Sequence, residues 1–196
     1  VARKPVKQTG HAGGRKTIVI VGVERGGTSM VAGVTRALGI DLGERAGRNH
    51  EDPKFLSDDE TVLEKHIKEN NRTKDIWGFK IPKASLKLGF YDQHLINPHY
   101  IIVFRNLASS VDSWGVRSGS GHFDSAKHVL RYYQEAVNVL SESNSPVAFA
   151  NYERACVDPD IFTPELASFL GVEPDQDKLR KAALVVTGDS AGYVDL

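Results

Sequence analysis

The chain has 196 residues with 25 acidic and 25 basic side chains, so its formal net charge is zero. A neutral chain argues against non-specific binding of nucleic acid, which needs surplus cations to displace phosphate counterions. Hydrophobic residues make up 40% of the chain, but no apolar run approaches the roughly 20 residues of a membrane span. These features predict a globular protein with neither a membrane span nor a nucleic-acid partner.

Composition also suggests how the chain is organised and where it works. The basic, glycine-containing stretch of residues 1–16 predicts a flexible arm, and residues 17–196 have the length of a single domain. The single cysteine, Cys156, allows no intrachain disulfide, and no apolar segment typical of a signal peptide is visible. We therefore expect a cytoplasmic protein. No feature of the sequence indicates its oligomeric state.

Four apolar segments are predicted to be strands, and each is followed by a stretch compatible with a helix. Residues 17–23 are almost all apolar and mostly β-branched, which is typical of a strand buried on both faces of a parallel sheet. The other three predicted strands are residues 76–81, 100–104 and 146–150. The alternation predicts an α/β fold, a three-layer structure with a mostly parallel sheet and flanking helices. In such sheets the ligand lies at the carboxyl ends of the strands.

Between these strands the periodicity of apolar residues predicts the helices. A helix from residue 28 to 38 ends at Gly39, and residues 43–60 form a polar loop or a partly helical lid. The clearest helix covers residues 125–140, with Asp124 as its N-cap. Two shorter helices are predicted at residues 60–70 and 163–170, the latter with Pro164 in its first turn.

A glycine-rich turn joins the first strand to the first helix. The segment Gly22–Ser29 matches the spacing of a Walker loop, except that Thr28 stands where that loop has its lysine. Glycines allow a tight turn whose backbone N–H groups, together with the helix N-terminus, can hold a phosphate. The missing lysine argues against ordinary ATP or GTP hydrolysis, in which it contacts the β- and γ-phosphates.

This turn resembles the 5′-phosphosulfate loop of sulfotransferases that use 3′-phosphoadenosine-5′-phosphosulfate (PAPS), particularly in the bacterial and carbohydrate branches. The resemblance implies a P-loop-like sulfotransferase fold. It also implies that the donor's 5′ side is held by the segment Arg25, Gly26, Gly27, Thr28 and Ser29.

A second segment resembles the 3′-phosphate motif of the same family. The predicted strand 100–104 runs into Arg105 and Asn106, and Ser113 follows eight residues after Arg105. A helix that starts after the strand can bring the serine hydroxyl back toward the arginine, so that both bind one phosphate. Two weak motifs in the right order are more specific than either alone.

Two further stretches extend the resemblance over roughly residues 17–172. The segment 77–82 resembles the family's central strand, whose lysine, here Lys80, lies near the transferred sulfuryl group. Tyr152 begins a segment similar to the family's region near the C-terminus, in which a tyrosine can lie against the adenine. A tyrosine that packs under the sheet is an equally good interpretation of Tyr152.

The catalytic base is where the family pattern breaks. Pro82 occupies the position of the cytosolic branch's catalytic histidine, and proline can neither accept nor donate a proton. The loop at residues 49–53 is the expected source of a replacement, with Glu51 first and then His50 and Asp52. His122, on a loop rich in glycine and serine, is a further candidate.

The resemblance predicts a sulfotransferase that transfers a sulfuryl group from PAPS to a hydroxyl or amine of a small molecule or glycan and releases PAP, the desulfated donor. No metal is expected. A P-loop kinase of a small metabolite and a nucleotide-binding module without catalysis remain as alternatives. The identity of the acceptor cannot be predicted from the sequence.

Overall fold

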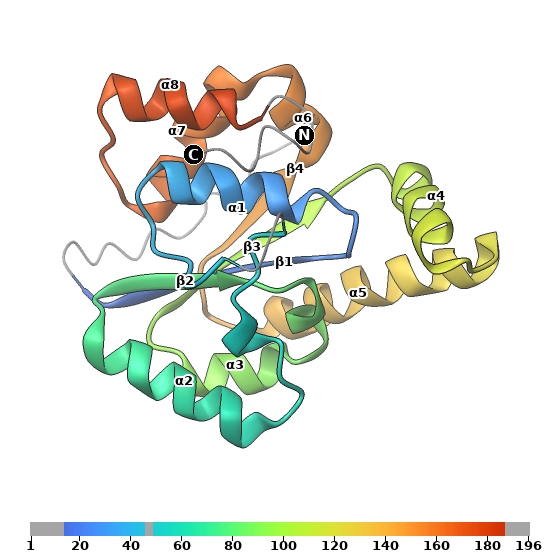
Figure 1. Ribbon diagram of the computed structural model, residues 1–196, viewed down its shortest axis with the longest axis horizontal. Coiled ribbons are helices and arrows are strands. Elements are labelled where there is room, and N and C mark those ends of the chain that lie inside the picture. Colours follow the sequence, from blue (N-terminus) through green and yellow to red (C-terminus); the bar gives the residue numbers. More distant parts are fainter. Residues whose placement is uncertain (1–13, 46–48, 187–196) are drawn as a thin grey trace.

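The computed structural model describes residues 14–45 and 49–186, which are built around a four-stranded sheet (Figure 1). Its strands are β1 (Lys16–Gly22), β2 (Ile76–Lys80), β3 (Pro98–Phe104) and β4 (Val147–Asn151). The strands are ordered β2-β1-β3-β4, and every neighbouring pair is parallel. The carboxyl ends of all four strands therefore meet at one edge of the sheet.

The central strand β1 is buried on both faces, as its run of β-branched residues predicts. Ile18 and Ile20 belong to the hydrophobic core on one side of the sheet, whereas Val19 and Val21 belong to the core on the other side. This division follows from the two-residue period of a strand. Packing on both sides fixes the position of Gly22, the first residue of the glycine-rich turn Gly22–Ser29, which we call the phosphate loop after its predicted role.

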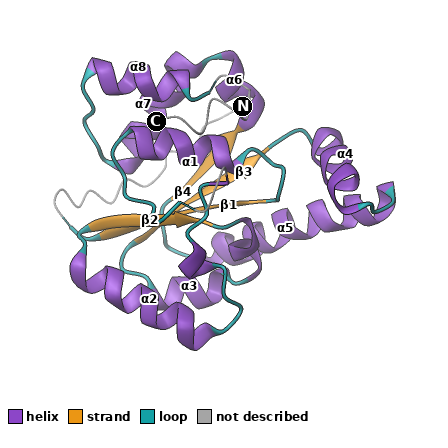
Figure 2. Ribbon diagram, in the orientation of Figure 1, coloured by secondary structure: helices purple, strands orange, loops and turns teal. Residues whose placement is uncertain are grey.

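Helices cover both faces of the sheet (Figures 1 and 2). One layer contains α1 (Thr28–Ala37), α6 (Tyr152–Val157), α7 (Pro159–Leu170) and α8 (Gln176–Leu184). The other contains α2 (Glu60–Thr73), α3 (Leu88–His94), α5 (His122–Glu142) and the 3-10 helices η2 (Pro53–Phe55) and η3 (Pro82–Leu86). Helix α4 (Leu107–Ser118) follows β3 and packs on α5 beyond the sheet (Figure 1). The predicted three-layer α/β architecture is confirmed.

Two predicted helix starts were wrong. Helix α5 begins at His122 after Gly121, so Asp124 lies in the first turn and is not the N-cap. Asp124 still carries negative charge near the positive end of the helix dipole. Helix α7 begins at Pro159, which places Pro164 inside the helix, on its exposed side. The hydroxyl of Thr163 donates to the Pro159 carbonyl within this turn.

The predicted N-terminal arm, residues 1–16, lies almost entirely outside the described residues, and Lys16 already belongs to β1. The division into an arm and a single domain stays a prediction. Within the part of the chain that the structure describes, no helix has both the length and the apolar character needed to cross a membrane.

Candidate active site

The carboxyl edge of the sheet opens into a cavity of about 1050 Å³. All four strands deliver residues to it at or just beyond their carboxyl ends: Glu24 after β1, Lys80 at the end of β2, Arg105 after β3 and Tyr152 after β4. This is the edge at which parallel α/β sheets bind their ligands. Six basic and three acidic side chains line the cavity, a local surplus of cations in a chain with no net charge.

The phosphate loop crosses this edge between β1 and α1. Arg25 has φ 66° and Gly27 has φ 88°, so both lie in the left-handed region that non-glycine residues rarely adopt. A Cβ atom at Gly27 would lie only 2.3 Å from the ring of Tyr152. Since Gly27 caps α1 without a side chain, no side-chain oxygen occupies the amide groups of the first helical turn. The loop presents these amides beside the cavity-lining Thr28 and Ser29.

Gly26 belongs to the loop but is not among the cavity-lining residues. Its amide donates to the Val23 carbonyl at 3.0 Å, and a Cβ atom would approach that oxygen to 2.8 Å. The structure therefore places Gly26 in the tight turn itself, where no larger residue fits.

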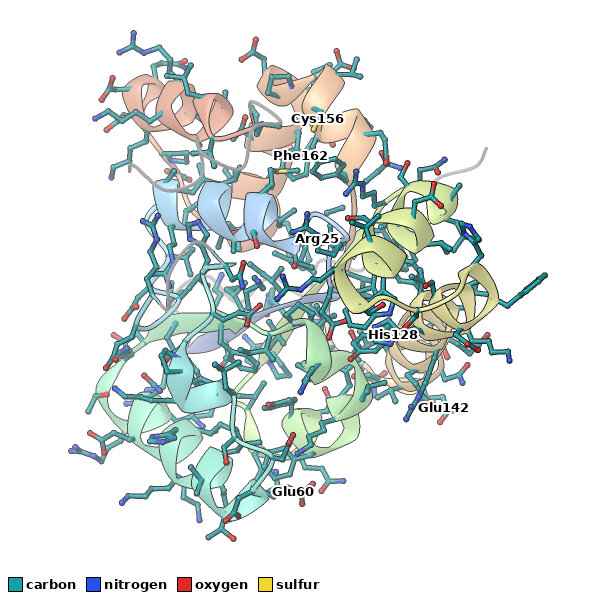
Figure 3. The ribbon with its side chains drawn as sticks, turned by 45° about the vertical axis from the view of Figure 1, so that its right-hand side comes forward. Arg25, Glu60, His128, Glu142, Cys156 and Phe162 are labelled. Atoms are coloured by element: carbon teal, nitrogen blue, oxygen red, sulfur yellow. The ribbon has the colours of Figure 1, made fainter. Side chains whose placement is uncertain are left out.

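The second predicted motif converges on the phosphate loop. Arg25 Nε donates to Ser113 Oγ at 3.1 Å, and an Arg105 side-chain nitrogen donates to the Arg25 carbonyl oxygen at 2.9 Å. The Arg105 guanidinium also lies over the ring of Tyr152, 5.0 Å from its centroid. Figure 3 shows Arg25 between the start of α1 and α4. Helix α4 thus brings Ser113 back to the strand ends as expected, although its partner is Arg25 and not Arg105.

Lys80 and Glu51 form a buried ion pair in the same cavity. Lys80 Nζ donates to Glu51 Oε1 at 2.8 Å, and the two side chains are 1% and 21% exposed. Burial lowers the pKa of Lys80 below its usual value because it disfavours the ammonium form, whereas the charges of Glu51 and Glu24 oppose that decrease. Lys80 faces the cavity that contains the phosphate loop.

The other predicted bases lie elsewhere. His50 is buried, with its ring beside Gly33 of α1, and Asp52 is buried and accepts the Lys54 amide at 3.0 Å as the N-cap of η2. His122 is exposed at the start of α5, 3.8 Å from Asp112. None of these three candidates lines the cavity, whereas Glu51 does.

No family model matches this sequence, and no curated protein matches it. Solved structures do match. The sulfotransferase domain of the olefin synthase from Synechococcus PCC 7002 aligns with a TM-score of 0.61 and 16% identity, covering 95% of this chain and 82% of that domain. The chain has the sulfotransferase fold.

Two further structures support that assignment of the fold. The sulfotransferase domain from the curacin biosynthetic pathway aligns at a TM-score of 0.60 and 17% identity, covering 90% of this chain and 79% of that domain. The mouse sulfotransferase SULT7A1, crystallised with PAP, aligns with a TM-score of 0.60 and 16% identity, covering 88% of this chain and 65% of that protein. Identities this low establish the sulfotransferase fold and not the activity.

Within this sulfotransferase fold, Glu24 connects the phosphate loop to α5, a contact that the sequence analysis did not predict. Its carboxylate accepts from Tyr132 Oη at 3.1 Å and lies 3.1 Å from His128 Nε2. Trp114 of α4 stacks on His128, with ring centroids 3.9 Å apart and nearly parallel planes. The residue before Arg25 therefore fastens the loop to α5, and the stacked ring of Trp114 connects that contact to α4. No spacing rule in the sequence indicates this contact, because more than 100 residues separate the partners.

Arg117 is a second cavity residue that the sequence patterns did not predict. It lies one helical turn after Ser113 on α4 and lines the same cavity. No acceptor for its side chain is found within residues 14–45 and 49–186. The four-residue spacing from Ser113 is the sequence signal that could have identified it.

The described residues contain no group of three or more His, Cys, Asp or Glu side chains that could hold a metal ion.

Proposed function

We propose that this chain is a sulfotransferase that transfers a sulfuryl group from PAPS to a hydroxyl or amine acceptor and releases PAP. One observation carries the proposal: the phosphate loop and the buried Lys80–Glu51 pair open into a single cavity at the carboxyl edge of the sheet. The loop suits an anionic donor, and the pair suits proton transfer and charge stabilisation next to it.

The loop residues fit the 5′ side of the donor. Gly27 has neither a side chain nor a capping oxygen, so the first-turn amides of α1 can donate to an anion. Thr28 adds a hydroxyl donor, Ser29 adds a second once its hydroxyl turns away from the Asn49 carbonyl, to which it donates at 3.3 Å, and Arg25 contributes a positive charge. When bound there, PAPS supplies the activated sulfuryl group.

Arg105 and Ser113 are assigned to the 3′-phosphate, and Arg117 is added to them. All three line the cavity, and Ser113 and Arg117 lie on one face of α4. Tyr152 is in contact with the Arg105 guanidinium and leaves no room for a side chain at Gly27. We propose that Tyr152 holds Arg105 beside the loop and lies at the edge of the adenine site.

The transfer step requires one base and one source of positive charge. The acceptor oxygen forms a bond to sulfur while the bond between sulfur and the 5′-phosphate oxygen breaks, and PAP leaves. Glu51 takes the acceptor's proton. Lys80 and the loop amides stabilise the negative charge that develops on the leaving oxygen. The pairing with Glu51 holds the lysine amino group in position for this role.

A P-loop kinase is the main alternative. It is disfavoured because Thr28 stands at the Walker lysine position, where a kinase needs a cation for the β- and γ-phosphates. A nucleotide-binding module without catalysis would share the donor site. The two alternatives differ in what they require of the Lys80–Glu51 ion pair: a sulfotransferase needs it in the cavity, and a non-catalytic module does not.

Calorimetry with PAP, AMP and Mg-ATP tests the donor assignment. PAP differs from AMP by its 3′-phosphate, and a charge-assisted hydrogen bond contributes about 1.5–3 kcal/mol. Wild-type protein should therefore bind PAP roughly 10- to 150-fold more tightly than AMP, without Mg²⁺. Arg105→Ala and Arg117→Ala should each reduce this preference while AMP affinity changes little.

The matched control is Arg131→Ala, which removes an exposed arginine of α5 that does not line the cavity. It should leave the preference for PAP unchanged. Tighter binding of Mg-ATP than of PAP would overturn the donor assignment. Binding of PAP without sulfuryl transfer to any acceptor in a broad panel would favour the non-catalytic module.

A further inference from the structure

The donor site proposed above assigns no residue to one wall of the cavity. It is built by residues 55–58, which include the end of η2, and by residues 81–87, which include η3. Lys87 joins the two segments because its amino group donates to the Asp58 carbonyl at 2.8 Å and lies 3.9 Å from the Asp58 carboxylate. We call this surface the η3 wall.

The periodicity of η3 divides its residues between the core and the cavity. Pro82, Ala84 and Ser85 are buried, whereas Lys83 and Leu86 are exposed. Residues three apart lie on the same face of a 3-10 helix, so Lys83 and Leu86 project from η3 side by side. Both line the cavity. The η3 wall thus presents a cation next to an aliphatic side chain.

The second segment extends the apolar part of the wall. Leu56 is 48% exposed and Leu86 is 36% exposed, although both line the cavity. The aromatic residues of this region, Phe55 and Tyr91, are almost fully buried and offer little ring surface. A saccharide would find no exposed aromatic ring to stack on here, and the two leucines cannot bond its hydroxyl groups. An aliphatic ligand gains free energy by covering them.

The charge of Lys83 is uncompensated in the described structure. Lys80 is paired with Glu51, and Lys87 with Asp58, but no carboxylate of the described residues lies within ion-pair distance of Lys83. An exposed ammonium beside the two exposed leucines is suited to an anionic group of a ligand. It also repels cationic ligands.

We propose that the acceptor of this enzyme is an amphiphilic alcohol, in which an aliphatic segment covers Leu56 and Leu86 and an anionic group pairs with Lys83. The inference rests on the proposed function, because it treats the η3 wall as the acceptor side of the cavity. It predicts that neutral saccharides and cationic amines are poorer acceptors than such an alcohol.

Binding of simple probes tests the charge. Octanoate, 1-octanol and octyltrimethylammonium are titrated by calorimetry into protein saturated with PAP. Octanoate should bind at least about tenfold more tightly than 1-octanol, because one charge-assisted contact contributes an effect of this size. Octyltrimethylammonium should bind most weakly of the three. Lys83→Gln should reduce octanoate affinity to that of 1-octanol. Lys65→Gln, which removes an exposed lysine of α2 remote from the cavity lining, should change nothing.

A series of acids from butyrate to octanoate tests the apolar part. Each added methylene should raise wild-type affinity up to about fourfold. Leu86→Ser and Leu56→Ser should flatten this dependence on chain length without reducing the affinity for butyrate. In transfer assays with PAPS, 8-hydroxyoctanoate should be a better acceptor than 1-octanol and than glucose.

The outcomes separate this inference from the donor assignment. If octanoate competes with PAP and Lys83→Gln weakens PAP binding, Lys83 belongs to the donor site and the inference is wrong. Equal binding of octanoate and 1-octanol would also overturn it. If octanoate binds in a Lys83-dependent manner but PAP does not bind, the wall recognises anionic amphiphiles and the donor assignment fails instead.

Discussion

Lys80 Nζ lies 2.8 Å from Glu51 Oε1, so the lysine predicted to stabilise charge and the carboxylate predicted to act as base are bound to each other. Lys80 ends a strand of the sheet, whereas Glu51 comes from a loop 29 residues earlier. The hydrogen bond uses Oε1, and within the described residues no donor reaches Oε2. Glu51 can therefore keep its contact with Lys80 and still accept a proton from an acceptor hydroxyl.

The base assignment predicts the effect of Glu51→Gln. Turnover should fall by roughly 10²-fold or more because the amide cannot accept the proton, while PAP affinity stays within a few-fold. Steady-state rates with PAPS and calorimetry with PAP measure the two quantities. Glu69→Gln, which changes an exposed carboxylate of α2, is the control and should leave both unchanged. Equal turnover in wild type and Glu51→Gln would remove Glu51 from the mechanism.

The same variant should shift the titration of Lys80. Burial already lowers the pKa of Lys80, and the negative charge of Glu51 is the largest factor that opposes this decrease. Glu51→Gln removes that charge, so the amino group should lose its proton at a lower pH than in wild type. NMR of ¹³C-labelled lysine ε-carbons measures this directly, without any activity. A pKa that stays constant or rises would contradict the ion pair.

The direction of this pKa shift has a consequence for stability. The folded-state pKa of Lys80 lies below its value in the unfolded chain. Between these two pKa values the unfolded chain binds more protons than the folded protein at this site. The contribution of Lys80 to the free energy of unfolding should therefore rise with pH through that window.

Two glycines with similar backbone angles should respond differently to alanine. Gly27 has φ 88° and Gly39 has φ 98°, so alanine should be strained at both by about 1–2 kcal/mol. A Cβ atom at Gly39 would meet nothing within 4 Å, whereas one at Gly27 would overlap the ring of Tyr152. Gly27→Ala should reduce PAP affinity at least tenfold, because the loss of one charge-assisted hydrogen bond is enough for an effect of this size. Gly39→Ala should leave PAP affinity unchanged. Thermal unfolding measures the backbone strain of each variant, and calorimetry measures its affinity for PAP. Similar PAP affinities of Gly27→Ala and Gly39→Ala would contradict the proposed role of the loop.

Asp92 is predicted to be a stabilising residue remote from the cavity. It accepts hydrogen bonds from the buried Tyr100 of β3 at 3.0 Å and from Ser143 and Ser145 after α5. Asp92→Ala should lower the free energy of unfolding by about 1–3 kcal/mol because the Tyr100 hydroxyl loses its partner. With Tyr100→Phe already present, the added cost should be smaller. Urea denaturation of the four proteins measures the coupling, and strict additivity would contradict it.

Local sequence patterns predicted the central strands β1 and β3 well because a strand that is buried on both faces requires a continuous apolar run. Each of the four apolar segments became a strand, and the parallel order followed from the helices between them. Helix starts were less accurate. Gly121, and not Asp124, is the N-cap of α5, and α7 accommodates Pro164 on its exposed side.

The loop before η2 shows what local patterns cannot supply. His50, Glu51 and Asp52 are equally polar neighbours, yet only Glu51 lines the cavity, while His50 and Asp52 are buried in structural positions. The direction of each side chain depends on backbone angles, including the positive φ of His50, and on contacts with α1 and η2. The catalytic roles proposed for these residues stay predictions.

Residue types alone predicted the kind of fold, and they predicted that the glycine-rich turn and the segment from Arg105 to Ser113 lie at the carboxyl edge of the sheet, where the structure has them; their nucleotide-binding roles stay predictions. These features depend on residue types at short spacings, such as the glycines between β1 and α1. Three other features are visible only in the folded chain: Ser113 contacts Arg25, Lys80 is paired with Glu51, and Lys83 lies beside Leu86 on the η3 wall. The first two contacts join residues separated by dozens of positions, and the last depends on which face of η3 the core covers. These contacts therefore depend on how the whole sheet and its helices pack, and no local sequence pattern predicts them.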